Sequence, residues 1–322
     1  QINKSSDVMY FGDFLDIGRK SGRDTEFDAR MARGVPEDLL TIIYTSGTTG
    51  EPKGVMLAHS NAIFQKERHD RRLIDPNDKD ISLCFLPLSH VFERIWTYYV
   101  FAVGMTNNYL DDTKKIVEFI QEVKPTIMCA VPRFYEKIYA TVFNRLEAAP
   151  PAKKKLFKWA IRTGAARNVK KRDKKFVGPW LALKYGLADR LVLSKLRDVV
   201  GGRIKFFPCA GAPLSQEIEE FFYATGVFIC YGYGLTETTA TVTCHEPHHF
   251  RFGAVGKPLD DVEVKIDEAN GEILIRGGNV MKGYYRDEAA TREVMKDGWL
   301  HSGDLAYRDE EGFFFLTGRK KR

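Results

Sequence analysis

The sequence lacks the features of a disulfide-rich, secreted or membrane-spanning protein. Its 322 residues include only five cysteines, and none of them forms a Cys-x-x-Cys pair. Most lie in apolar runs, so we predict reduced core residues of a cytoplasmic protein and no zinc or disulfide framework. No basic-then-apolar secretory signal opens the sequence. The longest uncharged run, 95–110, contains two asparagines and is shorter than the roughly 20 apolar residues that span a bilayer, so we expect a buried helix or strand there.

An initiator methionine is also absent, and neither internal repeats nor low-complexity tracts occur beyond short lysine clusters. Hydrophobic residues make up 44% and charged residues 29%, which is typical of a globular chain. Residues 1–36 are polar with weak periodicity. We expect them to form an N-terminal segment and linker, and the chain to be a fragment of a longer protein.

Positive charge is concentrated in one segment. The whole chain has a net charge of +6, but residues 150–205 contain 17 Lys and Arg against three Asp, a local net charge of +14. Such asymmetry favours an anionic partner, and an anionic membrane surface is one candidate. A solvated helical face explains the same pattern equally well. Nucleic acid is disfavoured, because the segment lacks aromatics at base-stacking intervals and any nucleic-acid-binding motif.

Apolar runs alternate with helical spacing through the first 250 residues. This alternation predicts the α/β fold class, with a largely parallel sheet and flanking helices. The expected strands are 39–44, 81–86, 126–131, 204–208 and 227–231. The expected helices are 55–63, 117–123, 134–146, a basic helical insertion at 150–203 and a helix capped by Ser215.

The pattern changes to period two after about residue 250. Asn270-Gly271 is a strong hairpin signal between 262–266 and 273–275. A second pair, 299–307 and 313–316, flanks another turn. We therefore predict a small antiparallel, barrel-like β subdomain. The expected domains are an N-terminal segment at 1–36, an α/β domain at 37–250, the β subdomain at 251–316 and a hinge at 317–322.

A loop rich in glycine and threonine, TSGTTGEPKG at 45–54, follows the first strand. Its glycines let the backbone turn tightly and direct N–H groups at one point, while Lys53 adds a cation. Such a loop suits a polyphosphate. It differs from the usual P-loop, because glycine and not Ser or Thr follows the lysine. The other interpretation is a flexible surface turn.

A second motif, YGYGLTETT at 231–239, also follows a strand, where ligands of open α/β sheets bind. Tyr233 could stack on a base and Glu237 could hold Mg²⁺. The alternative is a glycine-rich strand end with a solvated glutamate. Further on, Asp304 in GWLHSGDLAY could accept hydrogen bonds from two ribose hydroxyls or could simply form a turn. Arg319 in LTGRKKR could reach the same ribose.

These stretches, in this order, resemble the core motifs of the adenylate-forming superfamily, from about residue 37 to the end. The resemblance implies ATP or AMP binding, with Thr236, Glu237 and Lys53 catalytic. Implied phosphate contacts are Thr45, Ser46, Gly47, Thr48, Thr49, Gly50, Lys53 and Thr236. Implied nucleoside contacts are Gly211, Ala212, Pro213, Tyr233, Gly234, Asp304 and Arg319. Glu237 matches the magnesium ligand and Lys321 the hinge.

The segments LPLSHVFER at 86–94 and AVPRFYEKI at 130–138, together with the basic insertion, are most similar to long-chain fatty acyl-CoA synthetases. Residues 85–92 include no acid that could pair with an α-amine, which argues against an amino-acid substrate. His90 and Phe92 are expected in the acyl pocket, although His90 could be purely structural. Some relatives gate the tunnel with a tryptophan near this point, where the chain has Arg94 and then Trp96.

The resemblance implies ATP-dependent activation of a long-chain fatty acid to acyl-AMP and then acyl-CoA, releasing pyrophosphate and AMP. Mg²⁺ is the implied cofactor, and ATP and coenzyme A are co-substrates. Two alternatives stay open: a ligase that passes the acyl group to a carrier protein, and a non-catalytic nucleotide-binding or membrane-associated scaffold. Because the family's C-terminal lid would follow residue 322, we expect this fragment to turn over little. The expected location is cytoplasmic, with peripheral contact at the inner membrane face.

Overall fold

The structure is a computed structural model that describes residues 8–45 and 51–320. The chain divides into two compact units, 1–38 and 39–322. The first unit holds two helices, α1 (Phe11–Lys20) and α2 (Asp24–Arg33). Acidic residues lie in the first turn and basic residues in the last turn of each, which complements the helix dipole. The finer division of the chain at residues 36, 250 and 316 stays a prediction.

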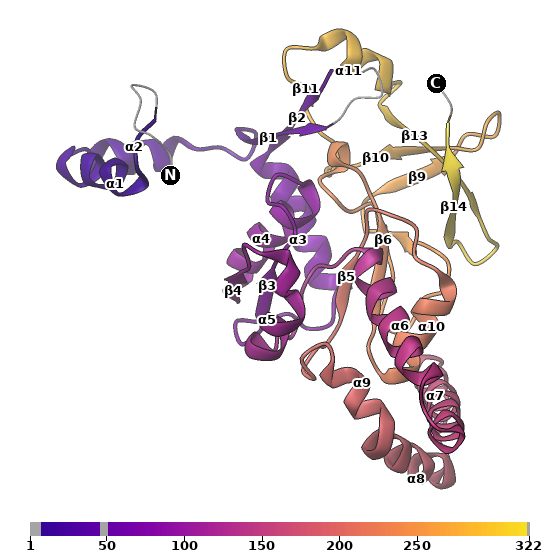
Figure 1. The fold of residues 1–322 in the computed structure, drawn as a ribbon. Helices are drawn as coiled ribbons and strands as arrows, with labels where there is room; N and C mark the ends of the chain where they lie inside the picture. Colours follow the sequence, from indigo (N-terminus) through magenta and orange to yellow (C-terminus); the bar gives the residue numbers. More distant parts are fainter. Residues whose placement is uncertain (1–7, 46–50, 321–322) are drawn as a thin grey trace. The chain divides into compact units, whose positions relative to one another are not determined.

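The second unit contains two parallel strand pairs, each with a helix between its strands in sequence (Figure 1). Strands β3 (Ile81–Cys84) and β4 (Thr106–Tyr109) flank α4 (Val91–Val103). Strands β5 (Phe207–Cys209) and β6 (Ile229–Tyr233) flank α10 (Gln216–Thr225). This arrangement confirms the predicted α/β class, and the uncharged run 95–110 is the expected buried helix followed by a strand.

The strand expected at 39–44 is present, but the prediction for the first helix was wrong at its start. Strand β1 (Leu39–Thr45) is half-exposed and pairs antiparallel with β2 (Lys53–Ala58), which covers the start of the helix expected at 55–63. Val55 and Leu57 are fully buried, so pairing and burial decide their conformation. Helix α3 (His59–Arg72) begins only after this strand, and β11 (Gly283–Tyr284) pairs with the other edge of β2.

The sheet around β6 is mixed and not largely parallel. Two short antiparallel strands, β7 (Thr243–Cys244) and β8 (Lys257–Pro258), continue it beyond β6. The strand expected at 126–131 is absent from the described part of the chain as a continuous element. It makes only two isolated parallel bridges, at Ile127 and Ala130.

Helices make up most of residues 113–198 of this unit, and they confirm most helical predictions. They are η1 (Thr113–Lys115), α5 (Ile116–Val123), α6 (Pro132–Glu147), α7 (Pro151–Arg172), α8 (Pro179–Ala188), η2 (Asp189–Leu193) and α9 (Ser194–Asp198). Helix α7 packs closely on α10, because a Cβ at Gly164 would lie only 2.1 Å from the Ala224 carbonyl oxygen. None of the described helices is both long and apolar enough to cross a membrane.

The later residues form an antiparallel sheet, as predicted, but an open one and not a barrel. The hairpin at Asn270-Gly271 is confirmed by the pairing of Ile266 with Ile273. The strands are β9 (Glu263–Ile266), β10 (Glu272–Arg276), β12 (Met295–Lys296), β13 (Trp299–Arg308) and β14 (Phe314–Arg319), with α11 (Glu288–Val294) before β12.

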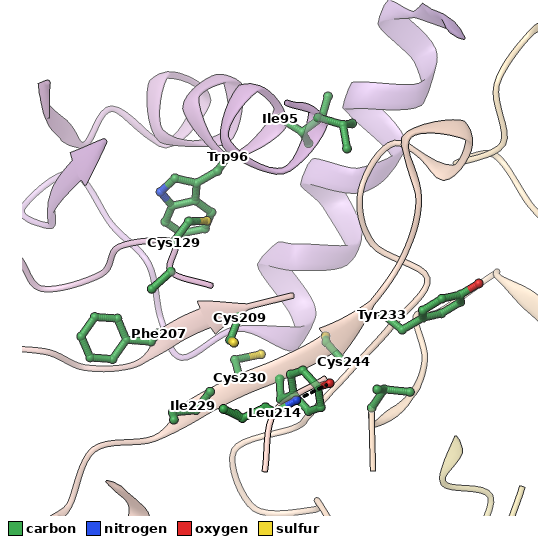
Figure 2. Close-up of a cluster of buried hydrophobic side chains, with 14 of the residues drawn as sticks. Ile95, Trp96, Cys129, Phe207, Cys209, Leu214, Ile229, Cys230, Tyr233 and Cys244 are labelled. Atoms are coloured by element: carbon green, nitrogen blue, oxygen red, sulfur yellow. Dashed lines mark hydrogen bonds between the residues drawn. The ribbon is translucent and has the colours of Figure 1, made fainter. Parts of the chain in front are cut away.

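A single large hydrophobic core lies beneath β5 and β6 and extends into the antiparallel sheet. Figure 2 shows buried side chains of this core, among them four cysteines on neighbouring segments. All five cysteines, Cys84, Cys129, Cys209, Cys230 and Cys244, are buried and free, which confirms that they are core residues without disulfides. Burial raises the pKa of the Cys209 thiol well above its usual value, so the thiol stays protonated.

Candidate functional site

The predicted phosphate loop lies between two paired strands. Thr45 ends β1, Lys53 begins β2, and the two residues are direct partners in the antiparallel ladder. Ser46, Gly47, Thr48, Thr49 and Gly50 lie outside the described residues. Packing explains the glycine at position 54, since a Cβ there would come within 2.9 Å of Ile42 and 3.2 Å of the Tyr44 ring. The hairpin therefore places Lys53 at the point where the loop rejoins the sheet.

Residues 281–285 connect this hairpin to the second motif. The Tyr285 amide donates to the Gly54 carbonyl at 2.7 Å, and the Met281 amide donates to the Glu237 carbonyl at 2.8 Å. The side chain of Tyr284 continues the connection: its hydroxyl lies 2.8 Å from Oε1 of Glu237. Two motifs that are far apart in the sequence thus lie on either side of one five-residue segment.

Tyr284 also lies close to Lys53. The ammonium nitrogen of Lys53 is 5.3 Å from the centre of the Tyr284 ring, within the range of a cation–π interaction. Lys53 and Glu237 therefore approach the same aromatic side chain, one at its face and the other at its hydroxyl. An arrangement of one cation and one carboxylate suits a magnesium-bound polyphosphate.

A side chain of α3 holds the turn that carries Glu237 in place. Thr236–Thr238 form a single 3₁₀ turn directly after β6. The fully buried amide of Gln65 donates hydrogen bonds to three backbone carbonyls of this turn and the residues after it, those of Thr238, Thr239 and Thr241, at 3.1, 2.8 and 2.7 Å. These bonds fix the conformation of the turn, and with it the direction of the Glu237 backbone.

The predicted base and ribose contacts meet through a direct hydrogen bond. The Tyr233 hydroxyl donates to Oδ2 of Asp304 at 2.8 Å, and Nε of Arg319 lies 3.5 Å from Oδ1 of the same carboxylate. Strand pairing explains the second contact, because Asp304 and Arg319 are direct partners in β13 and β14. Burial raises the pKa of Asp304, while the Tyr233 hydrogen bond and the Arg319 charge act in the opposite direction. Tyr233 itself is only 7% exposed.

Gly211, Ala212 and Pro213 form the turn after β5, which runs beside the end of β6. Gly211 has a φ of +91° and open space around a would-be Cβ, so glycine suits both its conformation and an approaching ligand. The Tyr231 hydroxyl holds the turn by donating to the Ala212 carbonyl and accepting from the Leu214 amide, both at 3.1 Å. Gly234, which follows Tyr233, is packed so tightly that a Cβ would lie 1.5 Å from the Ala240 carbonyl oxygen.

A mostly apolar cavity of about 40 Å³ begins beside Tyr233 and continues between α3, α4 and the β5–β6 strands. Its walls include Phe92, Trp96, Cys209 and Ala210. Burial lowers the pKa of His69, one of its few polar wall residues, to about 4, so this imidazole is neutral near pH 7. The cavity is small, and it places apolar side chains directly beside Tyr233.

The two predicted acyl-pocket residues differ in position. Phe92 lines the cavity, whereas His90 is outside its wall and is exposed. Nδ1 of His90 accepts a hydrogen bond from the Phe92 amide at 3.2 Å and so caps the N-terminus of α4. Trp96 lies in the cavity wall with its Nε1 bonded to Ser82, and the Arg94 guanidinium points to Thr41 and Leu88. The structural interpretation of His90 fits this geometry.

Sequence reasoning missed Tyr284 and Gln65. Tyr284 lies in GYY, a stretch with no motif signal, and its partner Glu237 is 47 residues away. Gln65 lies in the middle of α3 among charged residues, and its partners are 173 to 176 residues further on. Neither position could be found without the pairing of β2 with β11 and the packing of α3 beneath the Glu237 turn.

Comparison with known proteins gives matches over nearly the whole chain. The AMP-binding enzyme family matches residues 4–285. The chain is 37% identical over 299 residues to the long-chain-fatty-acid–CoA ligase FadD15 of Mycobacterium tuberculosis, covering 92% of this chain and 49% of that protein. It is 35% identical over 308 residues to the peroxisomal long chain acyl-CoA synthetase 6 of Arabidopsis thaliana, covering 89% of this chain and 42% of that protein. The chain spans about half the length of the curated relatives it matches.

Solved structures show the same fold. The ATP-bound MatB of Rhodopseudomonas palustris matches with a TM-score of 0.63 and 25% identity, over 89% of this chain and 49% of that one. The N-terminal domain of FACL13 from Mycobacterium tuberculosis matches with a TM-score of 0.64 and 21% identity, over 89% of this chain and 62% of that one. Since the family match covers well over half of the residues, the chain belongs to the AMP-binding enzyme family, whose members include acyl-CoA synthetases of the adenylate-forming superfamily.

Proposed function

We propose that this chain forms the nucleotide- and acyl-binding part of an ATP-dependent long-chain fatty acid–CoA ligase. The observation that carries the proposal is the link made by Tyr284 between Lys53 and Glu237, beside a cavity that begins at Tyr233. The names of the relatives at 35–37% identity support the substrate class. The proposed products are acyl-CoA, AMP and pyrophosphate, with acyl-AMP as the intermediate.

The chemical difficulty is electrostatic. A carboxylate is a poor electrophile, so its oxygen first attacks the α-phosphorus of ATP and expels pyrophosphate. An anion thus approaches a polyanion, and negative charge grows on the leaving pyrophosphate. We assign Lys53, with the hydroxyls and N–H groups of residues 45–50, to the β- and γ-phosphates, and Thr236 to the α-phosphate. Acyl-AMP then has a good leaving group, which the thiol of coenzyme A displaces.

The residues at the Glu237 turn fit a magnesium ion. Tyr284 orients Oε1 of Glu237, and the carboxylate is a hard oxygen donor of the kind this ion prefers. Among the described residues, no group of three or more His, Cys, Asp or Glu side chains is placed to hold a metal. That single carboxylate matches the usual magnesium site, in which substrate phosphates and water complete the shell. When bound, the ion would neutralise charge on the phosphates.

For the nucleoside, we assign the adenine to the turn formed by Gly211, Ala212 and Pro213, with Tyr233 and Gly234 beside it. The ribose is assigned to Asp304 and Arg319, which the ladder of β13 and β14 places together. Lys321, the proposed hinge, is one residue beyond the described part of the chain. The acyl chain is assigned to the cavity lined by Phe92 and Trp96.

Pyrophosphate release tests this assignment. The assay uses the full-length protein and compares saturated fatty acids of increasing chain length, amino acids and no acid, each with and without coenzyme A. Release that depends on a long-chain acid, with thioester formed only when coenzyme A is present, supports the proposal. Acyl-AMP that accumulates whether or not coenzyme A is added favours the ligase that serves a carrier protein. Absence of pyrophosphate release with every acid, whether or not ATP binds, favours a non-catalytic nucleotide-binding or membrane-associated scaffold.

A specific observation favours peripheral contact with an anionic membrane through residues 150–205, in keeping with a cytoplasmic location. Three large apolar side chains of α8, Trp180, Leu183 and Leu187, are 67, 66 and 54% exposed. Their spacing of three and four residues places them on one face, close to a segment rich in lysine. Co-sedimentation with vesicles tests this contact. A bound fraction that is the same with and without acidic lipid, and the same in Trp180→Ser, would contradict it.

A further inference from the structure

A second, larger cavity lies at the opposite end of β6 from the nucleotide motif. It has a volume of about 710 Å³ and is bounded by α7, α8, α9 and the residues that precede β5 and β6. Phe228 is in its wall and Tyr233 ends the strand, so about 17 Å of strand separates the two sites at roughly 3.3 Å per residue. We name this cavity the basic cleft. It stands apart from the nucleotide site, and its function does not depend on the proposed ligase activity.

The basic cleft is lined by positively charged side chains. They are Arg167, Lys171, Arg172, Arg197 and Arg203, with His248 beside them. No aspartate or glutamate is among the described residues of its wall. Convergence of like charges on one concavity costs free energy unless an anion is bound there.

Two of these cations are neutralised by carboxylates outside the wall. Arg197 makes a bidentate pair with Asp189, at 2.6 and 3.0 Å, and also donates to the Thr225 carbonyl at 2.9 Å. Arg172 donates to Asp173 at 2.8 Å. Arg197 therefore ties α9 to η2 and α10, whereas the charge of Arg172 is neutralised by its sequence neighbour at the end of α7.

The other cations have free donors. Lys171 and Arg203 are exposed and make no side-chain hydrogen bond or ion pair with any residue in 8–45 or 51–320. The Arg167 guanidinium carbon lies 3.9 Å from the centre of the Tyr185 ring, and Nη1 donates a hydrogen bond to Asn168. The contact with the ring holds a planar group that has further N–H donors to offer.

We propose that the basic cleft binds the phosphate of an organic phosphomonoester, held by Arg167, Lys171 and Arg203. Arginine and lysine together offer the forked and single donors that phosphate oxygens accept. Tyr185, Tyr223 and Phe228 provide an apolar wall for the organic part. The volume lies within the roughly 300–1,000 Å³ typical of ligand pockets.

The phosphate could belong to a lipid headgroup or to a small soluble molecule, and the same donors would recognise both. Helix α8 supplies Tyr185 to the cleft and exposes Trp180 on its surface, so a lipid could reach the cleft from a membrane. Two probes with the same phosphomonoester separate the sources. Glycerol 3-phosphate is the soluble probe, and vesicles of phosphatidylcholine with phosphatidic acid are the lipid probe.

Calorimetry with glycerol 3-phosphate and co-sedimentation with the vesicles form the two arms of the test. The variant Lys171→Gln/Arg203→Gln removes the two unpaired cations and should leave the fold intact. The control, Lys153→Gln/Lys155→Gln, removes the same charge from two exposed positions near the start of α7, away from the cleft. We expect the cleft variant to bind at least about tenfold more weakly than the control in one arm or both, since charge-assisted hydrogen bonds are lost.

The arm that shows the loss identifies the source of the phosphate. Equal weakening by both double variants would mean attraction by overall charge, and it would overturn the proposal. Failure of the unaltered chain to bind either probe would overturn it as well. Residual phosphate binding at the loop near Lys53 is common to both variants, so the difference between them reports on the basic cleft alone. Loss of nucleotide binding would leave this comparison unaffected.

Discussion

The hydroxyl of Tyr284 donates a hydrogen bond to Oε1 of Glu237 over 2.8 Å, while the face of the same ring lies 5.3 Å from the Lys53 ammonium nitrogen. The Tyr284 side chain thus lies between Glu237, the proposed metal ligand, and Lys53, the cation proposed to bind the phosphates. Its backbone is fixed by the pairing of β11 with β2, where Tyr284 is the partner of Val55. A shift of β11 would therefore change the position of the Tyr284 side chain relative to both Lys53 and Glu237.

Tyr284→Phe should weaken magnesium-dependent ATP binding while keeping the fold. The ring stays over Lys53, but Glu237 loses a hydrogen bond to a charged group, worth about 1.5–3 kcal/mol. In the full-length protein, we expect the concentration of Mg²⁺ needed for half-maximal pyrophosphate release to rise about tenfold. A magnesium titration at saturating ATP measures the change.

Tyr285→Phe is the matched control for that variant. Tyr285 is the next residue and is 37% exposed, and its backbone amide, which bonds to Gly54, is retained. The magnesium titration of this control should match the unaltered protein. If Tyr284→Phe also left the magnesium requirement unchanged, Tyr284 would have no part in orienting Glu237.

Local signals explain which parts of the fold were predictable. The hairpin at Asn270-Gly271 depends only on two turn residues and the alternation of apolar residues beside them, so its prediction was correct. Residues 55–57 were wrongly predicted as helix, because their strand conformation depends on pairing with β1 and with β11, far along the chain. The sheet after residue 250 was correctly predicted as antiparallel, but whether it closes depends on strand lengths and edges that period two does not encode.

The same distinction applies to the site. The glycine and threonine composition of residues 45–54 and the sequence 231–239 predicted the two nucleotide-binding motifs directly, and this assignment stays a prediction. Their spatial relationship depends on Tyr284, which carries no signal of its own. His90 was a reasonable candidate by type, yet its ring caps α4, since the residue before a helix is favourably placed to accept from the first turn.

Gly234→Ala should destabilise the protein strongly. An added Cβ would lie 1.5 Å from the Ala240 carbonyl oxygen and 2.5 Å from its carbon, both of them backbone atoms that cannot rotate away. We expect a loss of about 3 kcal/mol in the free energy of unfolding, as for other overpacked positions. Chemical denaturation measures it, and ATP binding should weaken because the displaced backbone leads into the Glu237 turn.

Gly318→Ala provides the comparison. Gly318 lies in β14 with nothing within 4 Å of a would-be Cβ, so the same substitution should change the free energy of unfolding by less than about 0.5 kcal/mol. Similar losses in the two variants would show that the close approach at Gly234 is not what destabilises the protein.

Phe92→Ala should change the selectivity for the acid. Phe92 lines the apolar cavity, so removing its ring widens the proposed acyl site and raises the relative kcat/KM for the longest or bulkiest acids. Each additional buried methylene contributes about 0.8 kcal/mol, which is roughly a fourfold change. Phe101→Ala removes the same ring from the same helix at a position that is 58% exposed. An unchanged chain-length profile in Phe92→Ala would exclude this cavity as the acyl site.

A buried pair between α10 and residues 245–254 should make stability depend on pH. Oε1 of Glu219 lies 3.2 Å from Nδ1 of His245, and Nε2 of His245 lies 2.9 Å from the Ala254 carbonyl oxygen, which can only accept. In a neutral imidazole Nε2 therefore carries the proton and Nδ1 has a lone pair, so a protonated Glu219 avoids placing a carboxylate against a second acceptor. Burial acts in the same direction: it raises the pKa of Glu219 to about 8 and lowers that of His245 to about 4.

The direction of the pH effect follows from proton binding. Between the ordinary glutamate pKa of about 4.5 and the folded value of about 8, the native state holds a proton that the unfolded state has lost. The contribution of Glu219 to stability therefore decreases as pH rises through this window. Glu219→Gln keeps a neutral donor and acceptor but cannot ionise. We expect it to be close to neutral at pH 5 and stabilising at pH 8, by on the order of 3 kcal/mol.

Urea denaturation at a series of pH values measures this difference. Glu220→Gln is the control, because Glu220 is on the exposed side of the same helix, and its variant should retain most of the pH dependence of the unaltered protein. A constant difference between Glu219→Gln and the unaltered protein from pH 5 to pH 8 would mean that Glu219 does not titrate in this window. The contact with His245 would then be a bond between a carboxylate and a protonated imidazole, and any fall in stability with rising pH would come from the imidazole as it loses its proton.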